Sequence, residues 1–176
     1  MKQHERGFIT IEILISIIFM SLLALGGGMT AIQVLKGTDQ CESYMAASRQ
    51  VQNAGYWIVR DAQMADSVTT DNLSSTEFLV LSWTENDESD NTTQHLVTYF
   101  FEDILEDHGT LKRNHSSSAG LNNETLVAQY VYFDSTDPVN TSNVSYINNV
   151  LAVKLVATFG DKSRTEEYRV SCRPDL

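Results

Sequence analysis

The chain has 176 residues, with 23 acidic and 12 basic side chains and a formal net charge of -11 at pH 7. This length is enough for one domain with a hydrophobic core and an additional segment. The acidic balance and the lack of a basic stripe argue against direct binding of nucleic acid, because phosphate contacts need clustered Lys and Arg.

The first predicted element is an apolar stretch over residues 8–35, in which Glu12 is the only formally charged residue. About 20 apolar residues are enough for a helix to cross a bilayer, so we expect 8–35 to be a transmembrane helix. Lys2 and Arg6 precede it, and acidic residues dominate the charged residues after it. The positive-inside rule therefore places the N-terminus in the cytoplasm and residues 36–176 on the other side of the membrane.

An ordinary secretory signal is the alternative interpretation of this stretch. The residues "ALG", 24–26, offer a small-x-small cleavage site. Two features count against it. Glu12 is costly inside an apolar signal, and the apolar character continues past the site through "MTAIQVL", residues 29–35.

The segment "RGFITIE", residues 6–12, resembles the signature of type IV prepilins. Gly7 follows a hydrophilic leader of six residues, Phe8 comes next, and Glu12 is the fifth residue counted from Phe8. The resemblance implies a leader peptide over residues 1–7, cleavage between Gly7 and Phe8 by a prepilin peptidase, and methylation at Phe8. It also implies a role for Glu12 in assembly, with the membrane and other minor and major pilins or pseudopilins as partners.

A second helix is predicted over about 39–68, where apolar residues recur at steps of three and four. These residues are Tyr44, Ala47, Val51, Ala54, Ile58, Ala62, Ala65 and Val68. Such a period is typical of a helix with one face on a core. We expect one rod, broken or bent at a weak point formed by Gly26, Gly27 and Gly28, because each glycine costs up to about 1 kcal/mol of helix propensity. Close packing of small residues in the membrane is the alternative explanation of the three glycines.

The rest of the chain predicts an antiparallel sheet over about 76–173. Runs rich in branched and aromatic residues indicate strands at 77–83, 95–101, 110–114, 125–133, 149–159 and 164–172. The last two runs form a hairpin around "GDKS", residues 160–163, whereas 114–124 and 134–148 are expected to be surface loops. One helix on one face of an antiparallel sheet is an α+β fold.

Several segments of residues 36–176 resemble the larger minor pseudopilins, notably the J type of type II secretion, and the similar minor pilins of type IV pili. These segments are "WIVRDAQMADSV" (57–68), "YFFEDILEDHGTLKRN" (99–114) and "VLAVKLVATFGDKSRTEEYRV" (150–170). The resemblance implies an extracytoplasmic pilin-like domain and a low-copy subunit at a fibre tip or in an initiation complex. The competing interpretation is an unprocessed single-pass surface anchor protein, such as an adhesin or a sensor.

The polar residues predict neither an enzyme nor a cofactor or metal site. His95, His108 and His115 lack tight ligand spacing, and no second cysteine pair accompanies them. The sequence has no G-x-S-x-G motif and no phosphate-binding glycine loop. The acidic segment "ENDESDN", residues 85–91, lacks the glycine and the final glutamate of a helix-loop-helix calcium site, so we expect a solvated loop.

The two cysteines, Cys41 and Cys172, both fall outside the cytoplasm in the predicted topology, where a disulfide can persist. Cys41 lies three residues before Tyr44 and extends the apolar stripe of the helix, while Cys172 shares a strand face with Tyr168 and Val170. Both thiols are thus expected in one helix–sheet layer, and we hypothesise a disulfide between them. Two unrelated buried thiols are the alternative.

Overall fold

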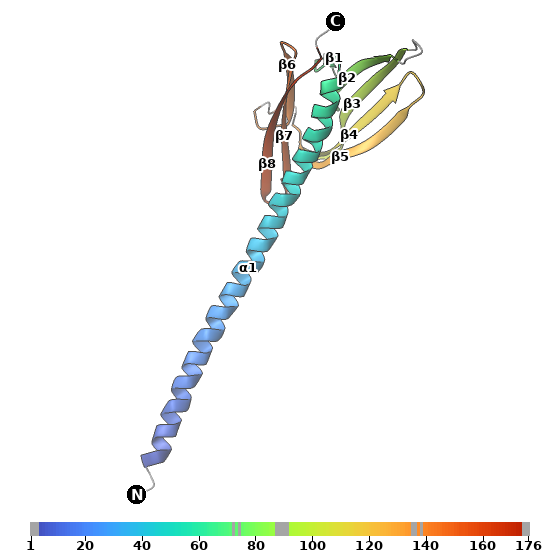
Figure 1. Cartoon of the computed structure of the whole chain (residues 1–176). Helices are drawn as coiled ribbons and strands as arrows, with labels where there is room; N and C mark the ends of the chain where they lie inside the picture. Colours follow the sequence, from blue (N-terminus) through green and yellow to red (C-terminus); the bar gives the residue numbers. More distant parts are fainter. Residues whose placement is uncertain are drawn as a thin grey trace. The chain divides into compact units, whose positions relative to one another are not determined.

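The computed structural model of the chain describes residues 4–71, 73, 75–86, 92–134, 137 and 139–173, with side chains from residue 11 onward. A single helix, α1 (His4–Met64), precedes all the strands (Figure 1). The strands are β1 (Ser67–Thr69), β2 (Glu77–Asn86), β3 (Thr92–Leu105), β4 (His108–Ser117), β5 (Asn122–Tyr132), β6 (Asn143–Ile147), β7 (Val150–Phe159) and β8 (Lys162–Ser171). The chain divides into two units, Met1–Glu42 and Ser43–Leu176, and α1 contributes to both. The predicted α+β class is confirmed.

The strands of the second unit form one antiparallel sheet in the order β1-β2-β3-β4-β5-β7, and β7 has partners along both of its edges. One edge pairs with β8 along its whole length, from Val150 to Phe159. The other edge is divided, because its first half pairs with β6 and its second half meets β5 at the single pair Val131–Ala157. The sheet therefore consists of a β1–β5 part and a β6–β8 part that meet at a short junction.

The α1 segment from Ser43 to Met64 covers the sheet with a face of small side chains. Ala47, Val51, Ala54, Ile58 and Ala62 are all at most 1% exposed, which confirms this part of the predicted stripe, whereas Tyr44 at its start is 41% exposed. Small residues allow the helix to approach the strands closely, and they meet apolar side chains from both parts of the sheet. The sheet side of this core consists of Leu79, Leu81, Val97, Tyr99, Phe101, Leu111, Val127, Val131, Leu151, Val153, Leu155 and Ala157.

Polar contacts align the helix with strands on both sides of it. The side-chain amide of Asn53 donates to the carbonyl of Val127 in β5 at 2.6 Å. On the other side, the hydroxyl of Tyr168 in β8 donates to the carbonyl of Val51 at 3.3 Å. Strand β8 runs in the same direction as α1, because its first residues meet the beginning of this helical segment and the chain after it meets the end. The last of these contacts is the hydrogen bond from the amide of Arg173 to the carbonyl of Ala65, at 3.3 Å.

The predicted end of the helix and two predicted loops were wrong. Helix α1 stops at Met64, before the expected residue 68, because the chain turns into β1 and the amide of Asp66 donates to the carbonyl of Ser82 at 2.9 Å. Most of segment 114–124 belongs to β4 and β5, with only a short turn between them. Segment 134–148 contains β6, and it also contains the buried residues Thr141 and Ser142.

Ser142 explains why that segment is part of the core. Its hydroxyl accepts a hydrogen bond from the amide of Val156 at 2.9 Å, and its own amide donates to the carbonyl of Tyr132 at 3.0 Å. Ser142 thus connects the end of β5 to β7 beside the junction of the two sheet parts. The β6–β7 turn after it uses Asn148 and Asn149 at φ values of 52° and 61°, a conformation that asparagine tolerates better than most residues.

A buried ion pair holds α1 against the middle of the β1–β5 part. The Asp61 carboxylate is 1% exposed and lies 2.6 Å from Nε and 3.0 Å from Nη2 of Arg113 in β4. The hydroxyl of Tyr99 in β3 donates to the same carboxylate at 2.5 Å. The Arg113 guanidinium also lies over the ring of Trp57, 5.2 Å from its centroid.

The surroundings hold Tyr99 neutral and Arg113 charged. Burial, followed by the charge and hydrogen bond of Asp61, raises the pKa of Tyr99 far above its ordinary range. Burial alone would lower the pKa of Arg113, but the hydrogen bond and charge of Asp61 outweigh it and raise the pKa. Local sequence patterns did not reveal this cluster, because Asp61 falls within an amphipathic helix pattern that gives no sign of a partner 52 residues later.

We predict that Asp61→Ala lowers the free energy of unfolding by about 3–5 kcal/mol, because it leaves the Arg113 charge buried without a partner. Urea unfolding of the purified full chain in detergent, followed by circular dichroism, measures the change. Asp161→Ala is the matched control, since Asp161 is exposed and faces only Lys162, and it should have little effect. Equal stability of Asp61→Ala and the original chain would contradict this role of the ion pair.

Candidate functional site

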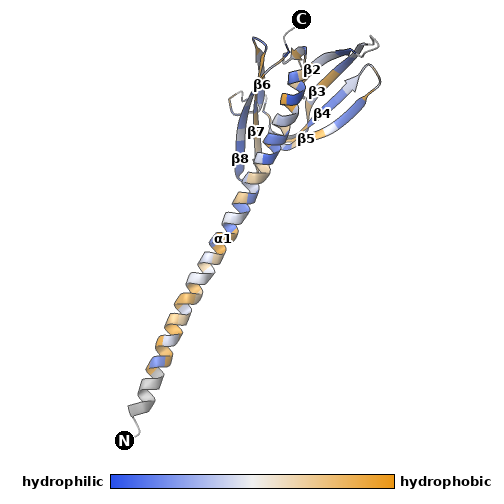
Figure 2. Cartoon of the chain, in the orientation of Figure 1, coloured by the Kyte–Doolittle hydropathy of each residue, from blue (hydrophilic) through white to orange (hydrophobic). Residues whose placement is uncertain are grey.

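The first unit is a helix whose described apolar side chains are all exposed. From residue 11 to residue 42 each described residue is exposed, and the large apolar ones between Ile11 and Leu35 are 47–73% exposed. Figure 2 shows the same segment as a nearly continuous apolar run. An exposed apolar surface of this extent marks a membrane or protein contact. The helix is long and apolar enough to cross a membrane, as predicted.

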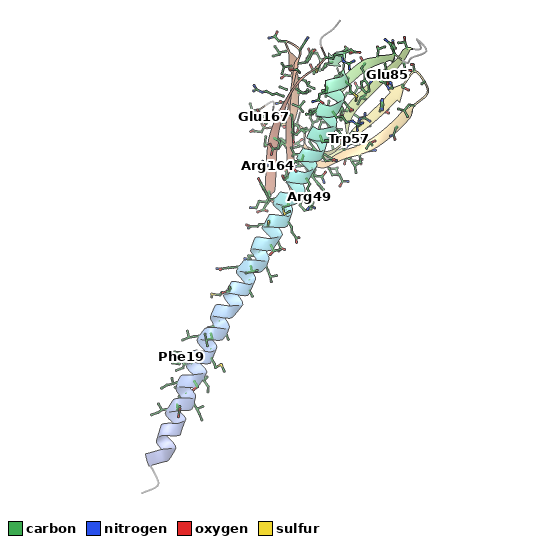
Figure 3. All side chains as sticks on the ribbon, viewed as in Figure 1. Phe19, Arg49, Trp57, Glu85, Arg164 and Glu167 are labelled. Atoms are coloured by element: carbon green, nitrogen blue, oxygen red, sulfur yellow. The ribbon has the colours of Figure 1, made fainter. Side chains whose placement is uncertain are left out.

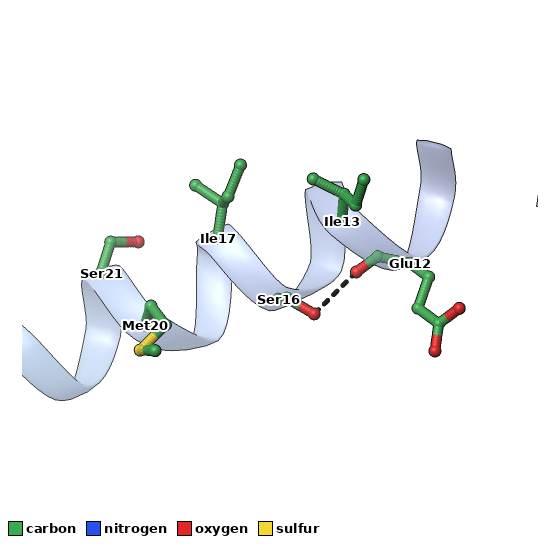
Figure 4. Close-up of a pocket in the computed structure, with 6 residues that line it drawn as sticks. All are labelled: Glu12, Ile13, Ser16, Ile17, Met20 and Ser21. Carbon is green, nitrogen blue, oxygen red and sulfur yellow. Dashed lines mark hydrogen bonds between the residues drawn. The ribbon is translucent and has the colours of Figure 1, made fainter. Parts of the chain in front are cut away.

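Glu12 is the charged residue of the apolar stretch from Ile11 to Leu35. Its side chain is exposed, and Figure 4 shows it directed away from Ile13 and Ile17. Among the described residues it has no ion-pair partner, while its backbone carbonyl accepts the Ser16 hydroxyl at 2.8 Å. Such a carboxylate at the centre of a bilayer costs roughly 2.5–3.5 kcal/mol on insertion scales, less near a helix end. The geometry therefore leaves Glu12 available to a cation from outside this part of the chain.

Gly7 and Phe8 lie in the first turns of α1, upstream of Glu12. No side chain before residue 11 is described, and residues 1–3 of the predicted leader lie outside the described residues altogether. Cleavage between Gly7 and Phe8 therefore stays a prediction. The helical register places Phe8 and Glu12 four residues apart, which makes them neighbours on one helix face.

Gly26, Gly27 and Gly28 do not interrupt the helix. The expected break was wrong, because α1 continues through all three, and the Thr30 hydroxyl donates to the carbonyl of Gly26 at 2.9 Å. A Cβ atom placed at any of the three would meet nothing within 4 Å. No contact among the described residues thus requires glycine there. Their role as a weak point stays a prediction, and so does close packing with another helix.

The hypothesised disulfide between Cys41 and Cys172 is absent, and both cysteines are free. Cys41 is exposed on α1, whereas Cys172 follows β8 and is buried. Strand β8 begins near Tyr44, because Arg164 donates to the Tyr44 hydroxyl at 2.6 Å, and the chain after β8 reaches the carbonyl of Ala65, just past the end of α1. Cys172 therefore lies beside the end of α1, whereas Cys41 belongs to the other unit.

Three aromatic side chains form a cluster at the end of the core where α1 stops. Trp83 of β2 stacks on His95 of β3 and on His115 of β4, with ring centroids 5.1 Å and 5.5 Å apart. Nδ1 of His95 and Nε2 of His115 face each other at 3.1 Å, and Nε2 of His95 lies 3.3 Å from the Glu85 carboxylate. The sequence indicates that these histidines lie on or beside neighbouring strands, but it does not show that they meet. The pairing register of β3 and β4 decides which residues share a face.

This cluster favours the neutral form of His115. Burial, then the positive charge of Arg113 and the neighbouring His95, lower the pKa of His115 below its ordinary value of 6.5, and the charge of Asp61 only partly opposes them. Below pH 6.5 the unfolded chain therefore binds a proton on His115 that the folded chain resists. By linkage, the stability that His115 contributes is present above pH 6.5 and is lost as the pH falls below it.

We predict a smaller urea midpoint at pH 5.5 than at pH 7.5, with part of the difference due to His115. His115→Gln should reduce the difference, because glutamine does not titrate. His108→Gln is the matched control, since His108 is the first residue of β4 and lies outside the cluster, and it should leave this difference in urea midpoint unchanged. If the urea midpoint differs between pH 5.5 and pH 7.5 by the same amount in His115→Gln and in the original chain, the linkage is contradicted.

No group of three metal-ligating side chains exists among the residues that the structure describes, and His108 packs on Tyr132, apart from the other two histidines. In the segment expected to be a solvated loop, Glu85 and Asn86 belong to β2, and residues 87–91 lie outside the described chain. No protein family, curated protein sequence or solved structure matches this chain. Its function must therefore be inferred from the apolar helix and from the domain that the helix joins.

Proposed function

We propose that this protein is a minor pilin or pseudopilin, made as a precursor in the cytoplasmic membrane. After cleavage by a prepilin peptidase, it assembles through its N-terminal helix into the tip or initiation complex of a type II secretion pseudopilus or a type IV pilus. The observation that carries the proposal is the exposed apolar helix with the carboxylate of Glu12, which has no ion-pair partner among the described side chains and is in register with Gly7 and Phe8. The α+β domain, with a helix on an antiparallel sheet, supports it.

Glu12 is best explained as an assembly residue. An anchor alone would be more stable with leucine at this position, because the carboxylate is costly in lipid. Cleavage before Phe8 creates a positive α-amino group, and N-methylation leaves it charged. In a low-dielectric bundle of helices, Glu12 of one subunit attracts the amino group of the next strongly. A subunit out of register leaves both charges buried and unpaired, so this pair selects the register of assembly.

We predict that the membrane-extracted protein begins at Phe8, and that Gly7→Leu abolishes this cleavage because a bulky side chain fills the position before the cut. Sequencing the N-terminus measures both, in cells that contain a prepilin peptidase. A protein beginning at Met1 indicates an unprocessed anchor, and one beginning at Gly27 indicates an ordinary signal peptide. Normal processing of Gly7→Leu would contradict the proposed route.

We predict that Glu12→Leu is still cleaved and still membrane-held but enters the fibre or tip complex at least tenfold less than the original. The physical reason is the loss of the carboxylate that neutralises the neighbouring amino group. Co-purification with partner pilins measures recruitment. Glu42→Leu is the matched control, since Glu42 is exposed on α1 beyond the apolar stretch and should assemble normally. Undiminished assembly of Glu12→Leu would show that Glu12 has another purpose.

A further inference from the structure

A groove of about 490 Å³ lies on the outward face of α1, beside β8. Its lining is mainly apolar and comes from Gln52, Gly55, Tyr56, Val59, Arg60, Gln63 and Tyr168. Gly55 makes the groove possible, because a Cβ there would lie 2.1 Å from Cζ of the Tyr168 ring. Tyr56 is 61% exposed, although it is one of the largest apolar side chains of the second unit. The domain thus presents an aromatic surface that nothing in the described fold covers.

The charged residue in the lining of this groove is the basic Arg60, in contrast to the net negative charge of the chain as a whole. Between Ser43 and Met64 the exposed charged residues are Arg49 and Arg60, and the carboxylate of Asp61 is buried. Arg60 lines the groove and is held over the ring of Trp57, 5.6 Å from its centroid. Arg49, which Figure 3 labels on α1, is exposed and precedes Tyr56 by seven residues in the sequence. In a chain of net charge -11, this face selects an acidic partner.

The turn between β3 and β4 has the opposite character. We call residues 102–107 the acidic hairpin tip, since Glu102, Asp103, Glu106 and Asp107 surround Ile104 and Leu105. The strand register shifts between Glu102 and Leu105, and three of the four acids have positive φ values of 48–63°. Ile104 is 39% exposed and Leu105 is 75% exposed. The fold therefore exposes an apolar pair that four acidic residues flank in the sequence, in a tight and bulged turn.

We propose that the acidic hairpin tip of one copy of this chain docks into the α1 groove of a second copy. Leu105 of the first copy packs on Tyr56 and Val59 of the second. The carboxylates of Glu106 and Asp107 face Arg60. Glu102 contributes less, because Lys112 in the same chain already pairs with it. The tip and the groove are both exposed within one copy, so neither is covered by the described part of its own chain.

The contact joins two different surfaces, so each docked copy still has one free groove or one free tip. A contact of this heterologous type extends into a row of subunits unless the rotation closes it. The two apolar residues of the acidic hairpin tip bury less surface area than a stable interface does, so another part of the chain must hold the two copies close together. Here the docking rests on the proposed function, because apolar helices held side by side in a membrane supply the high effective concentration.

Cysteine crosslinking of the full chain in membranes tests the docking. Both copies carry Cys41→Ser, since Cys41 is exposed, whereas Cys172 is buried and stays. One tagged copy carries Tyr56→Cys and a differently tagged copy carries Leu105→Cys. A short bis-maleimide should crosslink this mixed pair at least fivefold more than either variant with itself. Leu126→Cys replaces Leu105→Cys in the matched control, because Leu126 is apolar and 51% exposed on β5.

Charge reversal then tests the specificity. Arg60→Glu in the Tyr56→Cys copy should reduce the crosslink at least fivefold, and adding Glu106→Lys and Asp107→Lys to the other copy should restore it. Arg169→Glu, an equal change at an exposed arginine of β8, should not reduce it. A mixed pair that crosslinks no better than the Leu126→Cys control, or a crosslink indifferent to Arg60→Glu, would overturn the docking.

The same cells separate this docking from the proposed function. If the chain is cleaved before Phe8 and its assembly depends on Glu12, but Tyr56→Cys and Leu105→Cys do not crosslink, the docking fails and the function stands. If the mixed crosslink forms between chains that begin at Met1, the docking stands and the function fails. Crosslinking of Leu105→Cys to a different protein in place of the second copy would also overturn the docking.

Discussion

The ion pair between Asp61 and Arg113 joins α1 to the centre of the sheet, and the arrangement of the second unit depends on it. A helix with a face of alanines can slide along apolar strands, because small side chains interdigitate weakly. A buried carboxylate removes that freedom, since it must meet the guanidinium and the Tyr99 hydroxyl in one position. Burial of the pair costs desolvation, so its value lies in the specificity of the alignment more than in stability.

This alignment determines which surfaces of the domain remain open. With Asp61 turned toward β4, the opposite face of α1 is exposed, and it carries Tyr56 and Arg60. Gly55 lets Tyr168 of β8 lie against the helix beside that face, which produces the groove. The same alignment ends α1 beside Trp83 and the two histidines. The ion pair thus lies on the closed side of the helix, away from the open side that carries Tyr56 and Arg60.

The apolar face of α1 is buried in the second unit, whereas the apolar side chains of the first unit are exposed. In the second unit the stripe from Ala47 to Ala62 is covered by the chain's own sheet. In the first unit the residues from Ile11 to Leu35 have no cover in the described chain, and Glu12 has no charged partner there. This exposed apolar stretch is long enough to cross a membrane.

The sequence by itself determined the elements that depend on local pattern. The apolar run with Glu12, the period from Ala47 to Ala62, and the β7–β8 hairpin were all predictable, because burial repeats every 3.6 residues in a helix and every two in a strand. The turn at Asn148 and Asn149 also had a signal, in a residue type that tolerates positive φ. Only the tertiary structure decided which residues from distant strands meet. The register of β3 and β4 brings His95 to His115, the direction of β8 puts Cys172 beside the end of α1, and helix packing pairs Asp61 with Arg113. These contacts depend on non-local alignment, which no local pattern contains.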